Sequence, residues 1–250
     1  METDIRNILN FFCKGRGFEV APFKLGWYNE ALNSDKFKLT IGSDDSLSYV
    51  IISEPSMFEK TFLPFVKENW SDIVNNAIQD PLDQCMKQVF TEMLSHLLEF
   101  DQEAVKLHDF ELHPNRRPKI LVQTAGHVSG AVRFYQQSDA DKDLLEMNNN
   151  SKLYPVCLHP KYGGWFALRG VIILPNIKVP NLQRKEPPNV LKTEKEISHL
   201  LNLYNHHWQD GRFRDCGPNK DQKYSENQQN YFAHHPGPQR LQFLNNIMNL

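Results

Sequence analysis

Three absences in the sequence limit the class of the protein. No apolar run approaches the length of about 20 residues that a membrane-spanning helix requires. The N-terminus mixes charges into an amphipathic pattern and does not resemble a secretory signal. The formal net charge is −2 and there is no long basic run, which argues against a general role at nucleic acids or membrane surfaces. We therefore expect a cytoplasmic protein that binds neither.

The cysteines form no pair that would indicate a disulfide or a zinc site. None belongs to a CxxC motif, and the four lie far apart: Cys13, Cys85, Cys157 and Cys216. In a chain without an export signal they are expected to be free thiols. The histidine pairs at 206–207 and 234–235 and the Cys157-x-His159 motif lack a second, properly spaced ligand pair. No metal site is therefore expected.

Motifs for phosphate binding and hydrolysis are also missing. There is no P-loop and no GxGxxG, so Gly163-Gly164 indicates a turn and not a phosphate-binding loop. No order of serine, histidine and aspartate suggests a catalytic triad. Cys157 is a candidate nucleophile, but its place in an expected strand favours a buried thiol.

The apolar pattern predicts helices and strands without a regular βαβ repeat, so the expected fold class is α+β. With 250 residues, the chain is long enough to bury a large core as one domain over 1–250. Helices are expected over 4–12, 57–69, 81–100, 193–208, 225–235 and 238–250, the last two forming a C-terminal helical segment. Strands are expected over 47–53 and 104–112, with an extended segment over 18–27. Loops are expected over 33–46 and 138–152, and a proline-rich connector over about 175–190.

Side chains that can cap a helix precede three of the expected helices. Ser56 is expected to cap the helix over 57–69. Thr193 with Glu196 matches a capping box, in which each residue bonds the backbone N–H of the other. Ser225 with Gln228 has the same spacing.

The stretch HPNRRPKILVQTAGHVSGAVRFYQ at 113–136 predicts a helix with two internal glycines. Pro118 suits its first turn, where the missing N–H would have no intrahelical partner. Gly126 and Gly130 each cost about 1 kcal/mol relative to alanine inside a helix, which indicates a close approach to the backbone. The flank beside them also carries Gln123, His127 and Phe134. Either a large flat ligand lies against this flank, or another helix packs tightly through the small residues.

A second stretch, YPVCLHPKYGGWFALRG at 154–170, predicts two paired strands over 155–158 and 165–174 joined by a turn. Arg169 interrupts the second strand, which is otherwise apolar. A buried arginine needs an anionic partner, because an unpaired buried charge is costly. The partner is a carboxylate of the chain or of a ligand, and the sequence favours the internal pair.

Both stretches resemble the cblC family of cobalamin (vitamin B12) processing proteins, and the resemblance extends over about 17–244. The matching segments are GFEVAPFKLGWYNE from Gly17, DPLDQC from Asp80, HPNRRPKILVQTAGHVSG from His113, VCLHPKYGGWFALRG from Val156 and HWQDGRFRD from His207. The resemblance implies a fold like that of flavin-dependent nitroreductases, a mixed sheet flanked by helices, in a single domain.

The resemblance also implies an enzyme that binds cobalamin with its lower base detached and removes the upper axial ligand. Alkylcobalamins would lose their alkyl group to glutathione. Cyanocobalamin would be decyanated reductively, with electrons from FAD, FMN or a thiol, giving cob(I)alamin or cob(II)alamin. No covalent protein catalyst is expected, because the cofactor carries the reactive chemistry. A cblD-type partner is implied, with the chain a monomer or a ligand-dependent homodimer.

The resemblance assigns site residues by their matching positions. The implied cobalamin contacts are Asp109, Ile120, Leu121, Val122, Gln123, His127, Phe134, Tyr135, Gln136, Tyr154 and Leu168. The implied glutathione contacts are Arg169, Arg214 and Arg240. Guanidinium groups suit this role, because glutathione carries two carboxylates that they bind through paired hydrogen bonds.

His127 lies in part of the D-x-H-x-x-G motif of proteins that bind cobalt through a histidine. Ala125 occupies the position of the aspartate that would orient the imidazole. We therefore expect His127 to line the pocket and not to bind cobalt. Relatives carry tyrosines where this chain has Phe134, so a hydroxyl contact is lost there. The loop over 138–152, before Tyr154, differs in length and lies where it can change substrate access.

Two other functions remain open at this point. The first is a carrier that binds base-off cobalamin and delivers it to a cblD-type partner without catalysis. The second is a flavin nitroreductase that does not use cobalamin. A carrier has no use for a glutathione site, so the role of Arg169 and Arg214 distinguishes it from the enzyme.

Overall fold

A four-stranded sheet lies at the centre of the computed structural model, which describes residues 1–146, 152–217 and 221–248. The strand order is β1-β2-β6-β3 and each pairing is antiparallel. The strands are β1 (Phe18–Lys24), β2 (Ser46–Ser53), β3 (Val105–His108) and β6 (Ala167–Lys178). The expected α+β class is confirmed, whereas the pairing in this sheet is antiparallel and the resemblance implied a mixed sheet.

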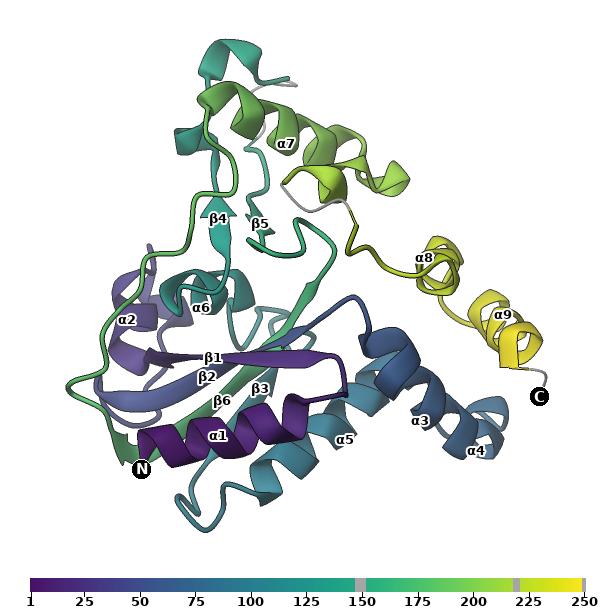
Figure 1. The fold of residues 1–250 in the computed structure, drawn as a ribbon, viewed down its shortest axis with the longest axis horizontal. Helices are drawn as coiled ribbons and strands as arrows, with labels where there is room; N and C mark the ends of the chain where they lie inside the picture. The colour runs from purple at the N-terminus through teal and green to yellow at the C-terminus, as the bar shows by residue number, and fades with distance from the viewer. Residues whose placement is uncertain (147–151, 218–220, 249–250) are drawn as a thin grey trace.

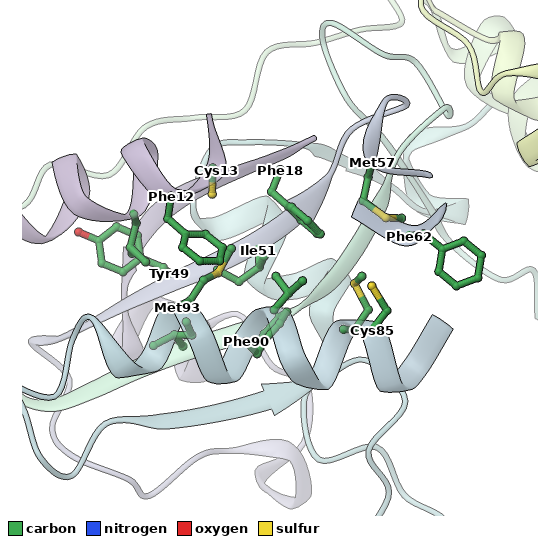
Figure 2. Packing of buried hydrophobic residues seen from close by; sticks show 14 of the residues in the cluster. Phe12, Cys13, Phe18, Tyr49, Ile51, Met57, Phe62, Cys85, Phe90 and Met93 are labelled. Carbon is green, nitrogen blue, oxygen red and sulfur yellow. The ribbon is translucent and has the colours of Figure 1, made fainter. Parts of the chain in front are cut away.

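Helices cover both faces of this sheet (Figure 1). One face carries α1 (Glu2–Cys13), the π-helix Phe58–Phe62, α3 (Leu63–Glu68), α4 (Trp70–Val74) and α5 (Pro81–Ser95). The other face carries α2 (Leu25–Glu30) and α6 (Val122–Val128). Because side chains alternate along a strand, Tyr49 and Ile51 of β2 join the first core and Val50 and Ile52 the second. Figure 2 shows Phe90 and Met93 of α5 packed in the first core.

A smaller unit stands beyond one end of the sheet. It contains β4 (Arg133–Tyr135), β5 (Val156–Leu158) and α7 (Glu194–His206), which share a third apolar core. The expected pairing of 155–158 with 165–174 is wrong: β5 pairs with β4, and β6 pairs with β2 and β3. The turn between the two segments contains an isolated bridge, His159 with Gly163, and both edges of β6 are occupied by β2 and β3.

The C-terminal segment contains α8 (Glu226–Ala233) and α9 (Pro238–Met248). Tyr231 of α8 is buried against Phe58 and Phe62, with ring centroids 5.4 and 5.2 Å away. The expected helices over 225–235 and 238–250 are confirmed, with 249–250 lying outside the described residues. Short 3-10 helices cover Asp35–Phe37, Gln137–Asp139, Lys142–Leu144, Trp208–Asp210 and Arg212–Asp215.

The helix expected over 113–136 is shorter than predicted. Only Val122–Val128 is helical, and 133–135 is the strand β4. Gly130 follows the helix with φ +77°, a left-handed conformation that ends a helix and favours glycine. Pro118 lies in a bridge with Leu112 and not in a first helical turn.

The capping predictions have mixed outcomes. The capping box of Thr193 and Glu196 is confirmed, with both reciprocal bonds present. Ser225 accepts a hydrogen bond from the N–H of Gln228, but Oε1 of Gln228 has no partner among the described residues. The cap at Ser56 is wrong, since its buried Oγ also lacks a partner in the part of the chain that the structure describes.

Other expected boundaries also moved: β3 ends at His108, before residue 112, and α2 begins at Leu25, inside the segment expected to be extended over 18–27. Helix α5 ends at Ser95, before the predicted residue 100, and β6 continues to Lys178, so the connector begins later than 175. The loop expected over 138–152 contains the two 3-10 turns given above, and its residues 147–151 lie outside the described residues. No described helix is long and apolar enough to cross a membrane.

Candidate functional site

The end of the sheet at which β2 and β3 stop and β6 begins contains a buried arginine. Arg169 has 8% of its surface exposed, and its Nε donates a hydrogen bond to Oγ of Ser53 at 2.9 Å. None of the ion pairs among the described residues includes Arg169. The internal ion pair favoured by the sequence is therefore absent at contact distance, although the burial itself is confirmed.

Two carboxyl groups lie within the electrostatic range of Arg169. Burial raises the pKa of Asp109, and the charge of Arg169 opposes that rise. Burial, together with the charges of Asp80 and Asp109, raises the pKa of Asp83 to about 6. The backbone N–H of Asp109 donates to the carbonyl of Arg169 at 3.1 Å, while its buried Oδ1 has no hydrogen-bond partner among the described residues.

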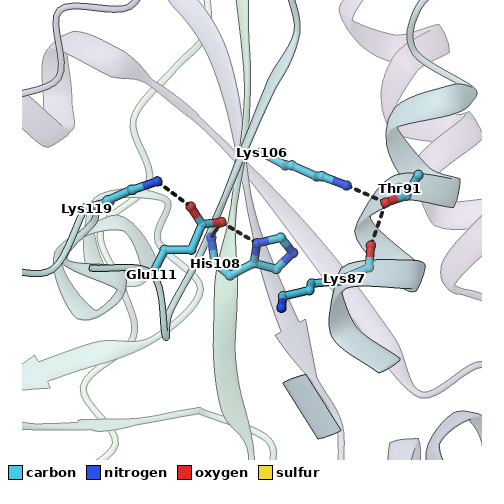
Figure 3. A network of polar contacts seen from close by, with 6 residues as sticks. All are labelled: Lys87, Thr91, Lys106, His108, Glu111 and Lys119. Carbon is cyan, nitrogen blue, oxygen red and sulfur yellow. Dashed lines mark hydrogen bonds and ion pairs between the residues drawn. The ribbon is translucent and has the colours of Figure 1, made fainter. Parts of the chain in front are cut away.

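The turn that carries Asp109 is fixed by a charged network (Figure 3). His108 Nδ1 lies 2.6 Å from one carboxylate oxygen of Glu111, and Lys119 Nζ lies 2.9 Å from the other. Burial alone would raise the pKa of Glu111, but the bonds from His108 and Lys119 lower it to about 2. The network therefore ties the end of β3 to the segment that precedes α6 and holds Asp109 between them.

The α6 flank brings together residues that the sequence singled out. Nδ1 of His127 accepts a hydrogen bond from the N–H of Phe134 at 3.4 Å. Burial, followed by the charge of Arg133, lowers the pKa of His127. Gln123 is exposed on the same helix, and its backbone carbonyl oxygen lies 4.0 Å from Sγ of Cys157.

The close approaches at the two glycines come from the protein itself. A Cβ on Gly126 would lie 2.8 Å from Cγ2 of Val132 and 3.0 Å from Cδ2 of Leu168. A Cβ on Gly130 would lie 2.6 Å from the carbonyl oxygen of Lys185. Neither contact comes from a second helix, so the small residues serve packing against β6 and the connector.

The predicted cobalamin residues divide by exposure. Four are buried in apolar cores: Ile120, Val122, Tyr135 and Leu168. The others are exposed or partly exposed: Asp109, Leu121, Gln123, His127, Phe134, Gln136 and Tyr154. The hydroxyl of Tyr135 accepts the N–H of Leu191 at 2.8 Å, so this polar group already has a partner.

A pocket of about 830 Å³ lies between α7 and α8. Its lining is rich in aromatic rings: Tyr154, Trp165, Tyr204, Trp208, Phe213, Tyr224 and Phe232. Tyr154 is 75% exposed and Trp208 is 59% exposed, so large apolar faces remain open to a ligand. Of the predicted site residues, Tyr154 and Arg214 line this pocket.

The three predicted arginines occupy different settings. Arg214 donates from Nη1 to the carbonyl of Gly164 at 2.6 Å. Arg240 donates from Nε to the carbonyl of His234 at 3.1 Å and lies 5.7 Å from the ring of Phe232. The ring of Phe232 contacts that of Tyr224, and the guanidinium of Arg214 lies over Tyr224. Arg214 and Arg240 are therefore at opposite ends of this pair of rings. Arg169 is at the end of the sheet, as described above.

The sequence reasoning missed most of the aromatic lining. Trp165 and Trp208 fall inside quoted segments, but Tyr224 and Phe232 lie outside them, and nothing in the spacing indicates that all four share one pocket. Burial raises the pKa of Cys157 well above the ordinary value of a thiol, in agreement with the expected buried thiol. Among the described residues, none of the four cysteines forms a disulfide.

The chain is similar to known proteins over most of its length. The chain is 44% identical to the cyanocobalamin reductase / alkylcobalamin dealkylase of Gallus gallus over 94% of each chain. It is 40% identical to the Homo sapiens protein of the same name over 91% of this chain and 76% of the relative. The crystal structure of a B12-trafficking protein, CblC, from C. elegans superposes with a TM-score of 0.87 at 33% identity, covering 97% of this chain and 95% of that one.

The family model of the methylmalonic aciduria and homocystinuria type C family matches residues 17–244. This range contains the whole central sheet, the aromatic pocket and the three arginines, and it begins after the helix α1. The chain belongs to the methylmalonic aciduria and homocystinuria type C family.

Proposed function

We propose that the protein binds cobalamin with the lower base detached and removes its upper axial ligand. The observation that carries this proposal is the shared name of the relatives, cyanocobalamin reductase / alkylcobalamin dealkylase, at up to 44% identity over 94% of this chain. The reactions are transfer of an alkyl group from cobalamin to glutathione and reductive decyanation of cyanocobalamin. FAD or FMN would supply electrons for the second reaction, and we assign no residue to the flavin.

The described residues fit parts of a cobalamin molecule. Its corrin ring carries amide side chains whose N–H groups donate hydrogen bonds, and the buried Oδ1 of Asp109 is an acceptor without a partner among the described residues. Gln123 and Gln136 are exposed and offer further amides. His127 is half-buried and would line the site without binding cobalt.

Arg214 fits a carboxylate of glutathione. It is half-buried in the wall of the aromatic pocket, and its guanidinium forms no ion pair with a described carboxylate. A cation in such a place also favours the thiolate form of a nearby thiol. Glutathione would supply the thiolate that takes the alkyl group, giving a thioether and cob(I)alamin, while the protein holds the two reactants in orientation.

The second candidate is a carrier that binds base-off cobalamin and transfers it to a cblD-type partner. The description of the C. elegans structure as a B12-trafficking protein favours it. We propose a single cobalamin-processing domain over 1–250, in the cytoplasm, as a monomer or a ligand-dependent homodimer. In either function the chain would bind the same ligand, so the two differ in whether a thiol or a reduced flavin then removes the upper axial ligand.

The test is a visible absorption spectrum of the purified protein mixed anaerobically with methylcobalamin, followed by glutathione. We expect a shift to the base-off spectrum and then conversion to cob(I)alamin. A base-off shift without a response to thiol would refute the dealkylase and favour the carrier. An unchanged spectrum after mixing with protein would refute both functions.

Variants of two neighbouring arginines sharpen this test. Arg214→Ala is expected to abolish the response to thiol and to preserve the base-off shift. Arg212→Ala is the matched control, because Arg212 is 61% exposed and does not line the pocket, whereas its ion-pair partner at 2.7 Å, Asp210, does. Arg169→Ala is less informative, since it also removes a buried hydrogen bond to Ser53.

A further inference from the structure

Arg214 lies in a cage of aromatic rings on the pocket wall. The centre of its guanidinium is 4.9 Å from the ring of Phe213, 5.2 Å from that of Tyr224 and 5.8 Å from that of Trp165. A cation over a ring face gains about 0.5–1 kcal/mol at exposed sites and more when it is desolvated. The rings therefore hold the charge in place and supply no competing carboxylate.

The adjacent carboxylate is kept away from this cation. Asp215 follows Arg214 directly, yet its Oδ1 accepts a hydrogen bond from Nε1 of Trp165 at 2.9 Å and pairs with Nζ of Lys223 at 2.7 Å. Both donors bind the same oxygen of Asp215. With the carboxylate of Asp215 engaged in this way, the guanidinium of Arg214 has no ion-pair partner among the described residues.

The turn at 163–164 sets the backbone of Arg214. The N–H of Gly164 donates to the carbonyl of Arg214 at 2.9 Å, and Nη1 of Arg214 donates back to the carbonyl of Gly164 at 2.6 Å. A Cβ on Gly164 would lie 2.5 Å from Cα of Arg214, and one on Gly163 would lie 3.0 Å from its carbonyl oxygen. A side chain at Gly164 would not leave room for the backbone of Arg214, so the glycine turn fixes the position of the arginine.

We propose that Tyr224, Trp165 and the Gly163-Gly164 turn are positioning residues that keep the guanidinium of Arg214 unpaired and oriented to receive a carboxylate of the thiol co-substrate. This inference rests on the proposed function for the identity of the co-substrate. It adds a physical reason why this arginine is available: three rings and a carbonyl hold its guanidinium, and Trp165 and Lys223 bind the carboxylate of the adjacent Asp215.

The test compares Tyr224→Leu, which removes the ring, with Tyr224→Phe, which keeps it. The probe is S-methylglutathione, which has both carboxylates of glutathione and no free thiol, titrated into the full-length protein by calorimetry. We expect Tyr224→Leu to weaken binding about three- to ten-fold, the range that a lost cation–π contact supports, and Tyr224→Phe to restore it. Gly164→Ala is expected to weaken binding at least as much.

A second ligand separates positioning from general damage to the pocket. The diethyl ester of S-methylglutathione lacks both carboxylates, so it should bind weakly and equally to the wild type and to Tyr224→Leu. If the wild type binds the acid more tightly than the ester and Tyr224→Leu binds both with the same affinity, the ring acts through recognition of the carboxylate. An equal loss of affinity for both ligands would refute the proposal, because a distorted pocket rejects both.

Phe12→Leu is the matched control for ring removal. Arg16 lies 4.1 Å from the centroid of Phe12, so the variant also removes a ring from beneath an arginine, and neither residue lines the pocket. It is expected to leave the affinity for S-methylglutathione unchanged. Unfolding midpoints of all the variants establish that each is folded at the titration temperature.

Catalysis gives an independent measurement. With methylcobalamin, Tyr224→Leu should raise KM for glutathione and leave the affinity for cobalamin unchanged. If the wild type binds S-methylglutathione in a Tyr224-dependent way but glutathione leaves methylcobalamin unchanged, the dealkylase function fails and the positioning role stands. If Tyr224→Leu, Gly164→Ala and the wild type bind S-methylglutathione equally, or the wild type does not bind it, the positioning role is wrong.

Discussion

Nε of Arg169 donates a hydrogen bond to Oγ of Ser53 at 2.9 Å across neighbouring strands of the central sheet. Ser53 also donates to the carbonyl of Ala167 at 3.4 Å, so a single hydroxyl links the last residue of β2 to the first residues of β6. Within the described residues, the side chain of the buried arginine therefore bonds a neutral hydroxyl and forms no ion pair. The charge of Arg169 therefore remains available at the end of the sheet.

Loss of this hydroxyl is expected to destabilise the protein. Ser53→Ala leaves the Nε–H of Arg169 without its acceptor, and a buried unsatisfied donor costs about 1–3 kcal/mol. The measurement is the free energy of unfolding in urea. Ser48→Ala is the control on the same strand, because the buried Oγ of Ser48 has no partner among the described residues. We expect that variant to be neutral or stabilising, and an equal loss in both would contradict the assignment.

Asp109 is expected to serve ligand binding more than stability. The buried Oδ1 of Asp109 has no hydrogen-bond partner among the described residues, which destabilises the fold, whereas the attraction of Asp109 to Arg169 stabilises it. Asp109→Ala removes both effects. We expect the free energy of unfolding to change by less than about 1 kcal/mol, because these effects oppose each other. Affinity for cobalamin, measured by the base-off shift, should fall about ten-fold or more as one hydrogen bond is lost.

Asp101→Ala is the matched control for that experiment. Asp101 is also buried, but it accepts hydrogen bonds from the side chain of Asn176 at 2.9 Å and from two backbone N–H groups, of Asn176 and Glu103. Its removal should lower stability and leave the affinity for cobalamin unchanged. The reverse pattern, with Asp109→Ala unfolding readily and binding normally, would make Asp109 a structural residue.

Local features of the fold could be predicted from the sequence. The capping box of Thr193 with Glu196 and the apolar stripe of α5 depend on residues within a few positions of one another, and both are confirmed. The pairing of β5 was not predictable in this way. It depends on the occupation of both edges of β6 by β2 and β3, which no local pattern encodes.

The same distinction applies to the candidate site. The sequence identified Arg214 and Tyr154 by resemblance, and both line the aromatic pocket. It could not place Tyr224 beside Arg214, because the contact joins two segments through a pocket wall. It also placed an internal carboxylate beside Arg169, where the fold provides Ser53. Burial was predictable from an apolar strand, whereas the partner depended on the register of β2 and β6.

Asp83 is expected to make stability depend on pH. Its pKa is about 6 in the folded protein and 3.8 without the fold, so between these values the folded state binds more protons than the unfolded state. The stability that it contributes is fully present below pH 3.8 and is lost as the pH rises through 6. Relative to Asp83→Asn, the wild type should therefore lose stability between pH 4 and pH 7 in urea titrations.

Asp35→Asn provides a control of opposite sign. The hydrogen bond and the charge of Lys38 lower the pKa of Asp35, so its contribution is present above its ordinary pKa and is lost only as the pH falls. The difference in stability between that variant and the wild type should therefore stay nearly constant between pH 4 and pH 7. If Asp83→Asn follows the wild type throughout this range, the raised pKa of Asp83 is wrong.

The two glycines near α6 are expected to differ in their tolerance of alanine. At Gly126 an added Cβ meets the side-chain ends of Val132 and Leu168, which can shift, so Gly126→Ala should cost about 1–3 kcal/mol as an overpacked core site. At Gly130 the residue has φ +77° and the Cβ would meet a backbone carbonyl at 2.6 Å, which cannot yield without moving the connector. Gly130→Ala should therefore be the more destabilising variant in urea unfolding. The opposite order would mean that the packing of α6 on β6, and not the left-handed turn after it, limits this part of the fold.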